Sequence, residues 1–85
     1  MDLIKLPSLD DYMKAVKKAK FNGQITSTQL IILRICYKAR KAEEPKHFNY
    51  FQKATSQTKE DCKWELNDLA TKGAIRMIRP DFYML

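Results

Sequence analysis

Apolar residues recur at helical spacing near the start of the chain. The stripe consists of Leu9, Tyr12, Met13, Val16 and Phe21. Spacing of this kind places side chains on one face of an α-helix. After Leu6-Pro7, Ser8 is suited to cap the helix, and Asn22-Gly23 is suited to end it because both residues tolerate left-handed backbone. Residues 1–23 are therefore expected to contain an N-terminal helix.

A second helical pattern, within residues 24–45, is apolar on most sides. Thr26 and Gln29 have the spacing of a capping box. The apolar residues that follow are Leu30, Ile31, Leu33, Ile35, Cys36 and Tyr37. Glu43-Glu44-Pro45 ends the pattern. Because a helix that is apolar on most sides needs neighbours around it, this one is predicted to be the central, most buried helix.

Residues 46–73 have the pattern of two short helices joined by a turn. Lys46-His47-Phe48 is predicted to be an extended link or a first strand, and Asn49 to cap a helix from Tyr50 to about Thr55. Ser56-Gln57 would form the turn. The sequence thus predicts a helix, a tight turn and another helix in close succession.

The second of these helices begins at Thr58, since Thr58-x-x-Asp61 has the form of a capping box. Cys62, Leu66 and Leu69 then follow at the spacing of one helix face. We expect this face to point inward. The residues predicted to be buried together are Leu33, Phe51, Leu66 and Leu69.

Residues 74–85 are predicted to form a β-hairpin. Gly73 ends the preceding helix, and Ala74–Ile78 and Phe82–Leu85 are strand-like runs. Between them, Pro80 fits the second position of a type I turn.

The order of these elements resembles the winged helix-turn-helix superfamily, as in MarR-like regulators and small plasmid or phage replication initiators. Phe48 stands where the superfamily has the apolar residue before its first motif helix, and Ser56 where glycine is common. Lys72-Gly73-Ala74-Ile75 is similar to the exit into the wing, and Phe82–Leu85 to the second wing strand. The resemblance implies a mainly α fold with a small β-hairpin: about four helices and a C-terminal wing, in one domain spanning residues 1–85.

The same resemblance implies sequence-specific binding of double-stranded DNA, with the recognition helix in the major groove. Lys63 would donate to guanine and Asn67 would pair with adenine. Arg76 and Arg79 on the wing would hold the backbone or the minor groove without reading sequence. The implied DNA-binding residues are Gln52, Thr58, Lys59, Glu60, Lys63, Trp64, Asn67, Arg76 and Arg79. Such a protein would be a small transcriptional regulator or a phage or plasmid accessory factor. It would need no cofactor, and its first helix could form a homodimer surface.

The net charge of the 85-residue chain, +6, favours an anionic partner. The distribution of this charge along the chain argues against DNA binding by the predicted recognition helix. Residues 24–57 carry six Lys or Arg and two Glu, whereas residues 58–85 carry five Lys or Arg and five Asp or Glu. The predicted recognition half is therefore neutral. The alternative is a protein–protein interaction module with this fold that docks a host or replication protein without binding DNA.

Trp64 allows two interpretations that bear on this alternative. Because large aromatic side chains mostly pack, we expect it to be partly buried against the wing. An exposed Trp64 would instead be an anchor for DNA or for a protein partner.

Other classes of function find little support in the sequence. Cys36, Cys62 and His47 lack the spacing of a zinc site, so buried free thiols are expected. The sequence contains no evident pair of a nucleophile and a base, and no evident pair of carboxylates, that would indicate an enzyme. Neither a signal peptide nor a membrane-spanning run is evident, which favours a cytoplasmic protein.

Overall fold

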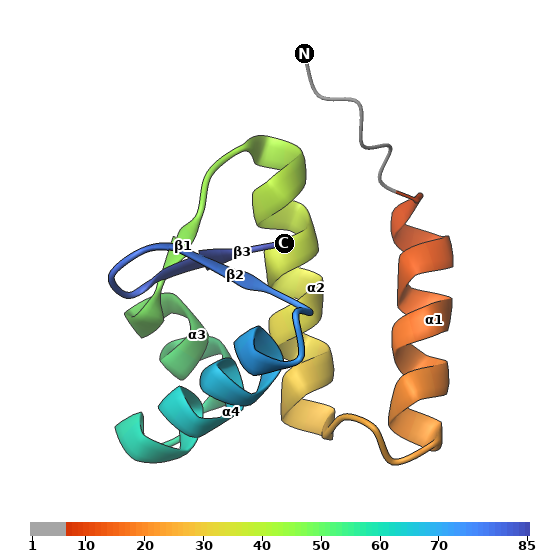
Figure 1. Cartoon of the computed structure of the whole chain (residues 1–85), viewed down its shortest axis with the longest axis horizontal. Helices are drawn as coiled ribbons and strands as arrows, with labels where there is room; N and C mark the ends of the chain where they lie inside the picture. Colours follow the sequence, from red (N-terminus) through yellow and green to blue (C-terminus); the bar gives the residue numbers. More distant parts are fainter. Residues whose placement is uncertain (1–6) are drawn as a thin grey trace.

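The computed structural model describes residues 7–85, so Leu6, which we expected to precede the first helix, lies outside this range. The chain is mainly helical, with a small antiparallel sheet near its C-terminus (Figure 1). This confirms the fold class expected from the sequence at that level. The elements in chain order are α1 (Leu9–Phe21), α2 (Ser27–Ala42), β1 (Lys46–His47), α3 (Phe48–Thr55), α4 (Lys59–Thr71), β2 (Arg76–Arg79) and β3 (Phe82–Met84).

Helix α2 is the centre of the fold, as predicted. It packs against α1, α3, α4 and β3. The four residues predicted to be buried together, Leu33, Phe51, Leu66 and Leu69, all belong to one core cluster. Phe51, Leu66 and Leu69 are completely inaccessible to solvent. Complete burial of these apolar side chains is the main force holding α3 and α4 to α2.

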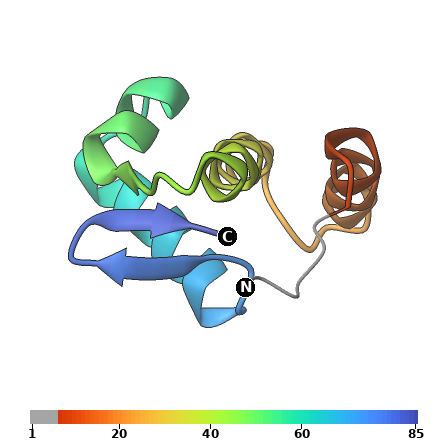
Figure 2. The same ribbon diagram turned by 90° about the horizontal axis from the view of Figure 1, so that it is seen from above.

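Helix α1 packs chiefly against α2, and Figure 2 shows it at one side of the molecule, away from α3 and the sheet. Val16 is its buried residue, and Tyr12 stacks on Tyr37 with ring centroids 5.0 Å apart. The prediction that Phe21 shares the apolar face is wrong, because its side chain is 91% exposed. Five residues of helix place it about 140° around the axis from Val16.

Local side-chain contacts explain where most helices begin. Ser8 caps α1, and Thr26 and Gln29 form the reciprocal capping box of α2, both as predicted. The cap of α3 differs from the prediction. His47, not Asn49, is the N-cap residue, and its Nδ1 accepts from the backbone N–H of Asn49 at 3.0 Å. The helix therefore begins at Phe48, because the pairing of β1 with β3 places His47 in extended backbone at this point.

The sheet has the strand order β1-β3-β2, with both pairs antiparallel. Lys46-His47 is thus the first strand, and the predicted hairpin of β2 and β3 is present. The turn between them is not the expected type I turn. Asp81 has φ of 67°, whereas a type I turn needs a negative φ there; the left-handed value is the one that type II requires. The Asp81 carbonyl also accepts from the N–H of Phe48 at 2.7 Å, which ties the turn to the start of α3.

Candidate nucleic-acid interface

The turn between α3 and α4 is held by backbone conformation and by two side chains. Ser56 adopts a left-handed conformation with φ of 54°, at the position where the resemblance indicated that glycine is common. Gln52 Nε2 donates to the carbonyl of Gln57 at 3.4 Å. Thr58 Oγ1 accepts from the N–H of Asp61 at 3.2 Å and so caps α4. Gln52 and Thr58, both predicted as DNA contacts, therefore also shape the turn.

The two sides of α4 differ sharply in exposure. Cys62, Leu66 and Leu69 are completely buried, as the sequence predicted. The opposite side carries five of the predicted DNA-binding residues, all exposed: Lys59, Glu60, Lys63, Trp64 and Asn67. The structure thus brings these five residues together on one continuous helical face.

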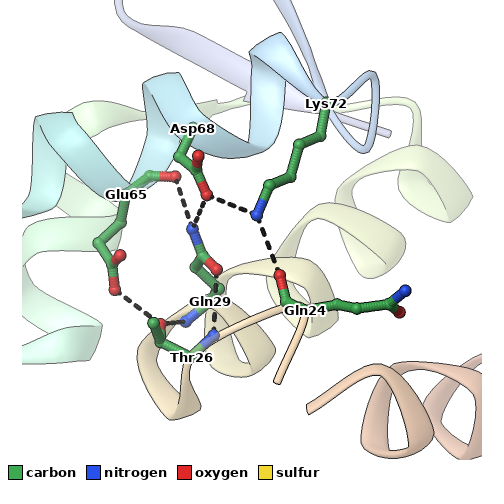
Figure 3. Close-up of polar contacts among 6 residues, drawn as sticks. All are labelled: Gln24, Thr26, Gln29, Glu65, Asp68 and Lys72. Atoms are coloured by element: carbon green, nitrogen blue, oxygen red, sulfur yellow. Dashed lines mark hydrogen bonds and ion pairs between the residues drawn. The ribbon is translucent and has the colours of Figure 1, made fainter. Parts of the chain in front are cut away.

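A polar network joins the middle of α4 to the start of α2 (Figure 3). Gln29, only 1% exposed, accepts through Oε1 from the Thr26 N–H at 3.1 Å and donates through Nε2 to Asp68 Oδ2 at 2.8 Å. Thr26 Oγ1 donates to Glu65 Oε2 at 2.8 Å. Lys72 Nζ lies 2.9 Å from Asp68 Oδ2 and donates to a backbone carbonyl in the α1–α2 loop. We call these residues the α2–α4 network; its members are Gln24, Thr26, Gln29, Glu65, Asp68 and Lys72.

The network changes the interpretation of the charge on α4. Of the acidic residues on this helix, Glu65 is buried against α2 and Asp68 is held by Gln29 and Lys72. The hydrogen bonds from Lys72 and Gln29 lower the pKa of Asp68, so it stays ionised within the network. Two of the negative charges counted against DNA binding therefore do not belong to the outer face. Sequence reasoning missed this arrangement, although Gln29 was visible as part of a capping box.

The expectation that Trp64 packs against the wing is wrong. Its side chain is 61% exposed and lines a shallow polar hollow with Gln57, Asp61 and Glu65. Helical geometry explains this, because Trp64 is about 200° around the helix from the buried Cys62. The outer face of α4 therefore combines two lysines, an amide and the carboxylate of Glu60 with one large aromatic ring.

The wing arginines lie on β2, whose residues are all exposed. Arg76 Nη2 donates to the carbonyl of Leu85 at 3.2 Å, and the Arg79 guanidinium lies 4.1 Å from the ring centroid of Phe82. Lys63 on α4 lies 5.6 Å from the ring centroid of Phe48. Such contacts with aromatic faces and backbone orient these cations while their charge stays accessible to an anion.

Cys36 and Cys62 are buried free thiols, as predicted, and burial raises the pKa of Cys36 to about 12. Within the described range, no group of three or more His, Cys, Asp or Glu could hold a metal ion. The described helices are all too short or too polar to span a bilayer.

Comparison of the chain with protein-family models, with curated proteins and with solved structures finds no match.

Proposed function

We propose that this protein is a winged-helix protein that binds double-stranded DNA in a sequence-specific manner. One observation carries the proposal: the order helix, strand, helix, turn, helix and hairpin, with strand order β1-β3-β2, leaves one whole polar face of α4 exposed. The major groove of B-DNA admits an α-helix, and a helix presented in this way can enter it. A role as a small transcriptional regulator or as a phage or plasmid accessory factor is part of the proposal.

In this docking mode α4 would read bases and β2 would position the protein. Lys63 and Asn67, one turn apart, would face base edges, with Lys63 donating to guanine and Asn67 pairing with adenine. Arg76 and Arg79 would contact phosphates and add affinity without sequence information. The burial of Glu65 and the pairing of Asp68 support the proposal, because they take negative charge away from the DNA.

A homodimer would double this contact surface. The protein–DNA area available to one small chain is modest. Helix α1 extends to one side of the molecule and ends in the 91% exposed Phe21 (Figure 2). We include dimerisation through α1 in the proposal, and analytical ultracentrifugation of wild type and Phe21→Ser would test it.

The test of DNA binding is fluorescence anisotropy with random and selected duplexes across a range of salt concentrations. Affinity should fall steeply as salt rises, because phosphate contacts release counterions. Arg76→Ala with Arg79→Ala should weaken binding to all duplexes and reduce the salt slope. Lys63→Ala or Asn67→Ala should instead reduce the preference for the selected site by about 1–3 kcal/mol.

The matched control is Lys38→Ala with Lys41→Ala, which removes the same charge from exposed positions near the end of α2. If this control weakens binding as much as the wing double variant does, net charge and not the wing governs affinity. If α4 and wing variants both leave DNA binding intact, the proposed docking mode is wrong.

A second candidate function is docking of a protein through α4. The exposure of Trp64 beside Glu60 and Asp61 favours it, since exposed Trp residues are enriched among interface hot spots. Weak affinity for duplex DNA at every salt concentration would support this candidate. Glu60→Lys separates the two: it should tighten binding to DNA, but weaken docking to a basic protein surface.

A further inference from the structure

An apolar hollow of about 370 Å³ lies between α2 and α3. Its apolar lining consists of Leu30, Ile31, Ile35, Tyr50 and Ala54. Ile31 is 41% exposed and Tyr50 is 50% exposed. Exposed apolar side chains that gather in one hollow are typical of binding surfaces, whereas single ones are common anywhere on a protein.

The hollow exists because α2 has more apolar faces than the core can cover. Ile32, Leu33 and Cys36 point into the core cluster. Leu30 and Ile35 are only partly buried at its margin, and Ile31 points outward. Since its floor is continuous with the packed core, the hollow is a firm feature of the surface and not the gap under a loose loop.

Every charged side chain that lines this hollow, within the described range, is a cation. Arg34 and Lys38 lie one turn apart on α2, and Lys46 lies on β1. Lys46 Nζ is 5.0 Å from the ring centroid of Tyr50 and 3.9 Å from the exposed carboxylate of Glu44, a weak solvent-screened pair. The apolar floor is therefore rimmed by positive charge.

A second hollow adjoins the first across α2. Leu30 and Arg34 line both, and α1 contributes Leu9, Met13 and Lys17 to the second, together with Asp10 as its acidic residue. The apolar surface therefore continues from α3 over α2 toward α1. A partner segment longer than one helical turn could lie along it.

We propose that the α2–α3 hollow docks an acidic amphipathic helix of a partner protein. Apolar side chains one turn apart on the partner would fill the floor, as in other helix-in-groove complexes. Flanking carboxylates would pair with Arg34 and Lys38. This charge complementarity selects the occupant: an apolar floor gives a phosphate backbone nothing to pair with, and the lysine-rich exposed face of α1 in a second copy would be repelled.

The site is separate from the proposed DNA interface. Its lining in residues 7–85 includes none of the α4 and β2 residues assigned to DNA. The inference therefore goes beyond the proposed function and does not depend on it. A protein with both surfaces could hold DNA and a partner at the same time.

The probe is a fluorescein-labelled peptide of roughly 16 residues, designed as a helix with Leu one turn apart and Glu on the flanking positions. A matched peptide carries Lys in place of Glu. Fluorescence anisotropy with the full chain should show binding of the acidic peptide and at least about tenfold weaker binding of the basic one. Equal affinity for both peptides, or binding of neither, would overturn the proposal.

Variants locate the binding surface. Arg34→Glu with Lys38→Glu should weaken binding of the acidic peptide by at least about tenfold. The control Lys14→Glu with Lys18→Glu makes the same charge change on α1 outside both hollows and should have much less effect. If both double variants weaken binding equally, the peptide responds to net charge and the proposal fails.

The apolar floor has its own test. Ile31→Asp places a charge on the exposed part of the floor, so circular dichroism should show a folded protein that no longer binds the peptide. Unchanged binding would contradict the proposal. Peptide-induced NMR shifts at Trp64, and not at Ile31 and Tyr50, would also contradict it. A wild-type dimer that Ile31→Asp dissociates would show that a second copy, and not an acidic partner, occupies the hollow. Duplex DNA affinity of the variant should stay at the wild-type value.

Discussion

Replacement of Gln29 by Ala tests whether the α2–α4 network holds α4 in place. Gln29 is 1% exposed, so water cannot readily replace its hydrogen bonds. The substitution removes the bonds that Nε2 donates to Asp68 and, at 3.5 Å, to the Glu65 carbonyl, and the bond that Oε1 accepts from the Thr26 N–H. The reverse capping bond, from the Gln29 N–H to Thr26 Oγ1 at 3.0 Å, uses backbone and remains.

The expected loss follows from these contacts. A hydrogen bond to a charged group contributes about 1.5–3 kcal/mol, and a neutral one about 0.5–1.5 kcal/mol. Asp68 keeps Lys72 as a partner, and its side chain is 27% exposed, so water can replace part of the hydrogen bonding that Asp68 loses. We therefore expect Gln29→Ala to lower the free energy of unfolding by about 2–3 kcal/mol, a large share of the stability of a small domain.

Urea denaturation followed by circular dichroism measures this change, as a lower midpoint with an unchanged slope. Gln24→Ala is the matched control, because Gln24 is exposed and joins the network through its backbone carbonyl alone. A loss below about 0.5 kcal/mol for Gln29→Ala, within the range of ordinary surface substitutions, would refute the reasoning. A double-mutant cycle with Asp68→Ala should show a coupling of at least about 0.5 kcal/mol.

Leu66→Ala should lower the free energy of unfolding by about 2–5 kcal/mol, because this side chain of α4 is fully buried in the core. An unchanged midpoint in urea denaturation would contradict the assigned inward face. Thr58→Ala should lower thermal stability by about 0.5–2 kcal/mol through loss of the α4 cap, whereas Ser56→Gly, at a left-handed position, should not destabilise. Burial raises the pKa of Cys36 from 9.0 to about 12, because the folded protein favours the neutral thiol. The contribution of this thiol to the free energy of unfolding is fully present below pH 9 and is lost as the pH rises toward 12. Cys36→Ala should flatten that alkaline loss, and iodoacetamide should modify Cys36 at pH 8 only after unfolding.

Much of the local structure follows from short-range patterns. Thr26 and Gln29 are three residues apart, and their capping box needs only the geometry of the first helical turn. Cys62, Leu66 and Leu69 could likewise be assigned to one buried face, because helical spacing alone puts them there. The five exposed residues of α4 follow from the same register. These features depend on contacts within one or two turns of helix.

Other features depend on contacts between distant segments, and sequence patterns did not reveal them. Glu65 accepts from Thr26 and Asp68 accepts from Gln29, and each pair is separated by 39 residues in the chain. Nothing in the local sequence therefore marks these two acids as inward-facing. His47 caps α3 because pairing of β1 with β3 sets its backbone.

The sequence by itself determined the helices, most of their caps and the face that α4 buries, because each depends on residues within a few positions of one another. The tertiary structure decided which charges remain on the outer face of α4 and where apolar surface stays uncovered. The apolar pattern of α2 predicted a helix with neighbours on most sides. From that pattern alone, neighbouring elements would be expected to cover Leu30, Ile31 and Ile35. They line a hollow because α1 and α3 pack on either side of α2 without closing over it. Such an outcome depends on the angles and distances between whole helices, which no local pattern encodes.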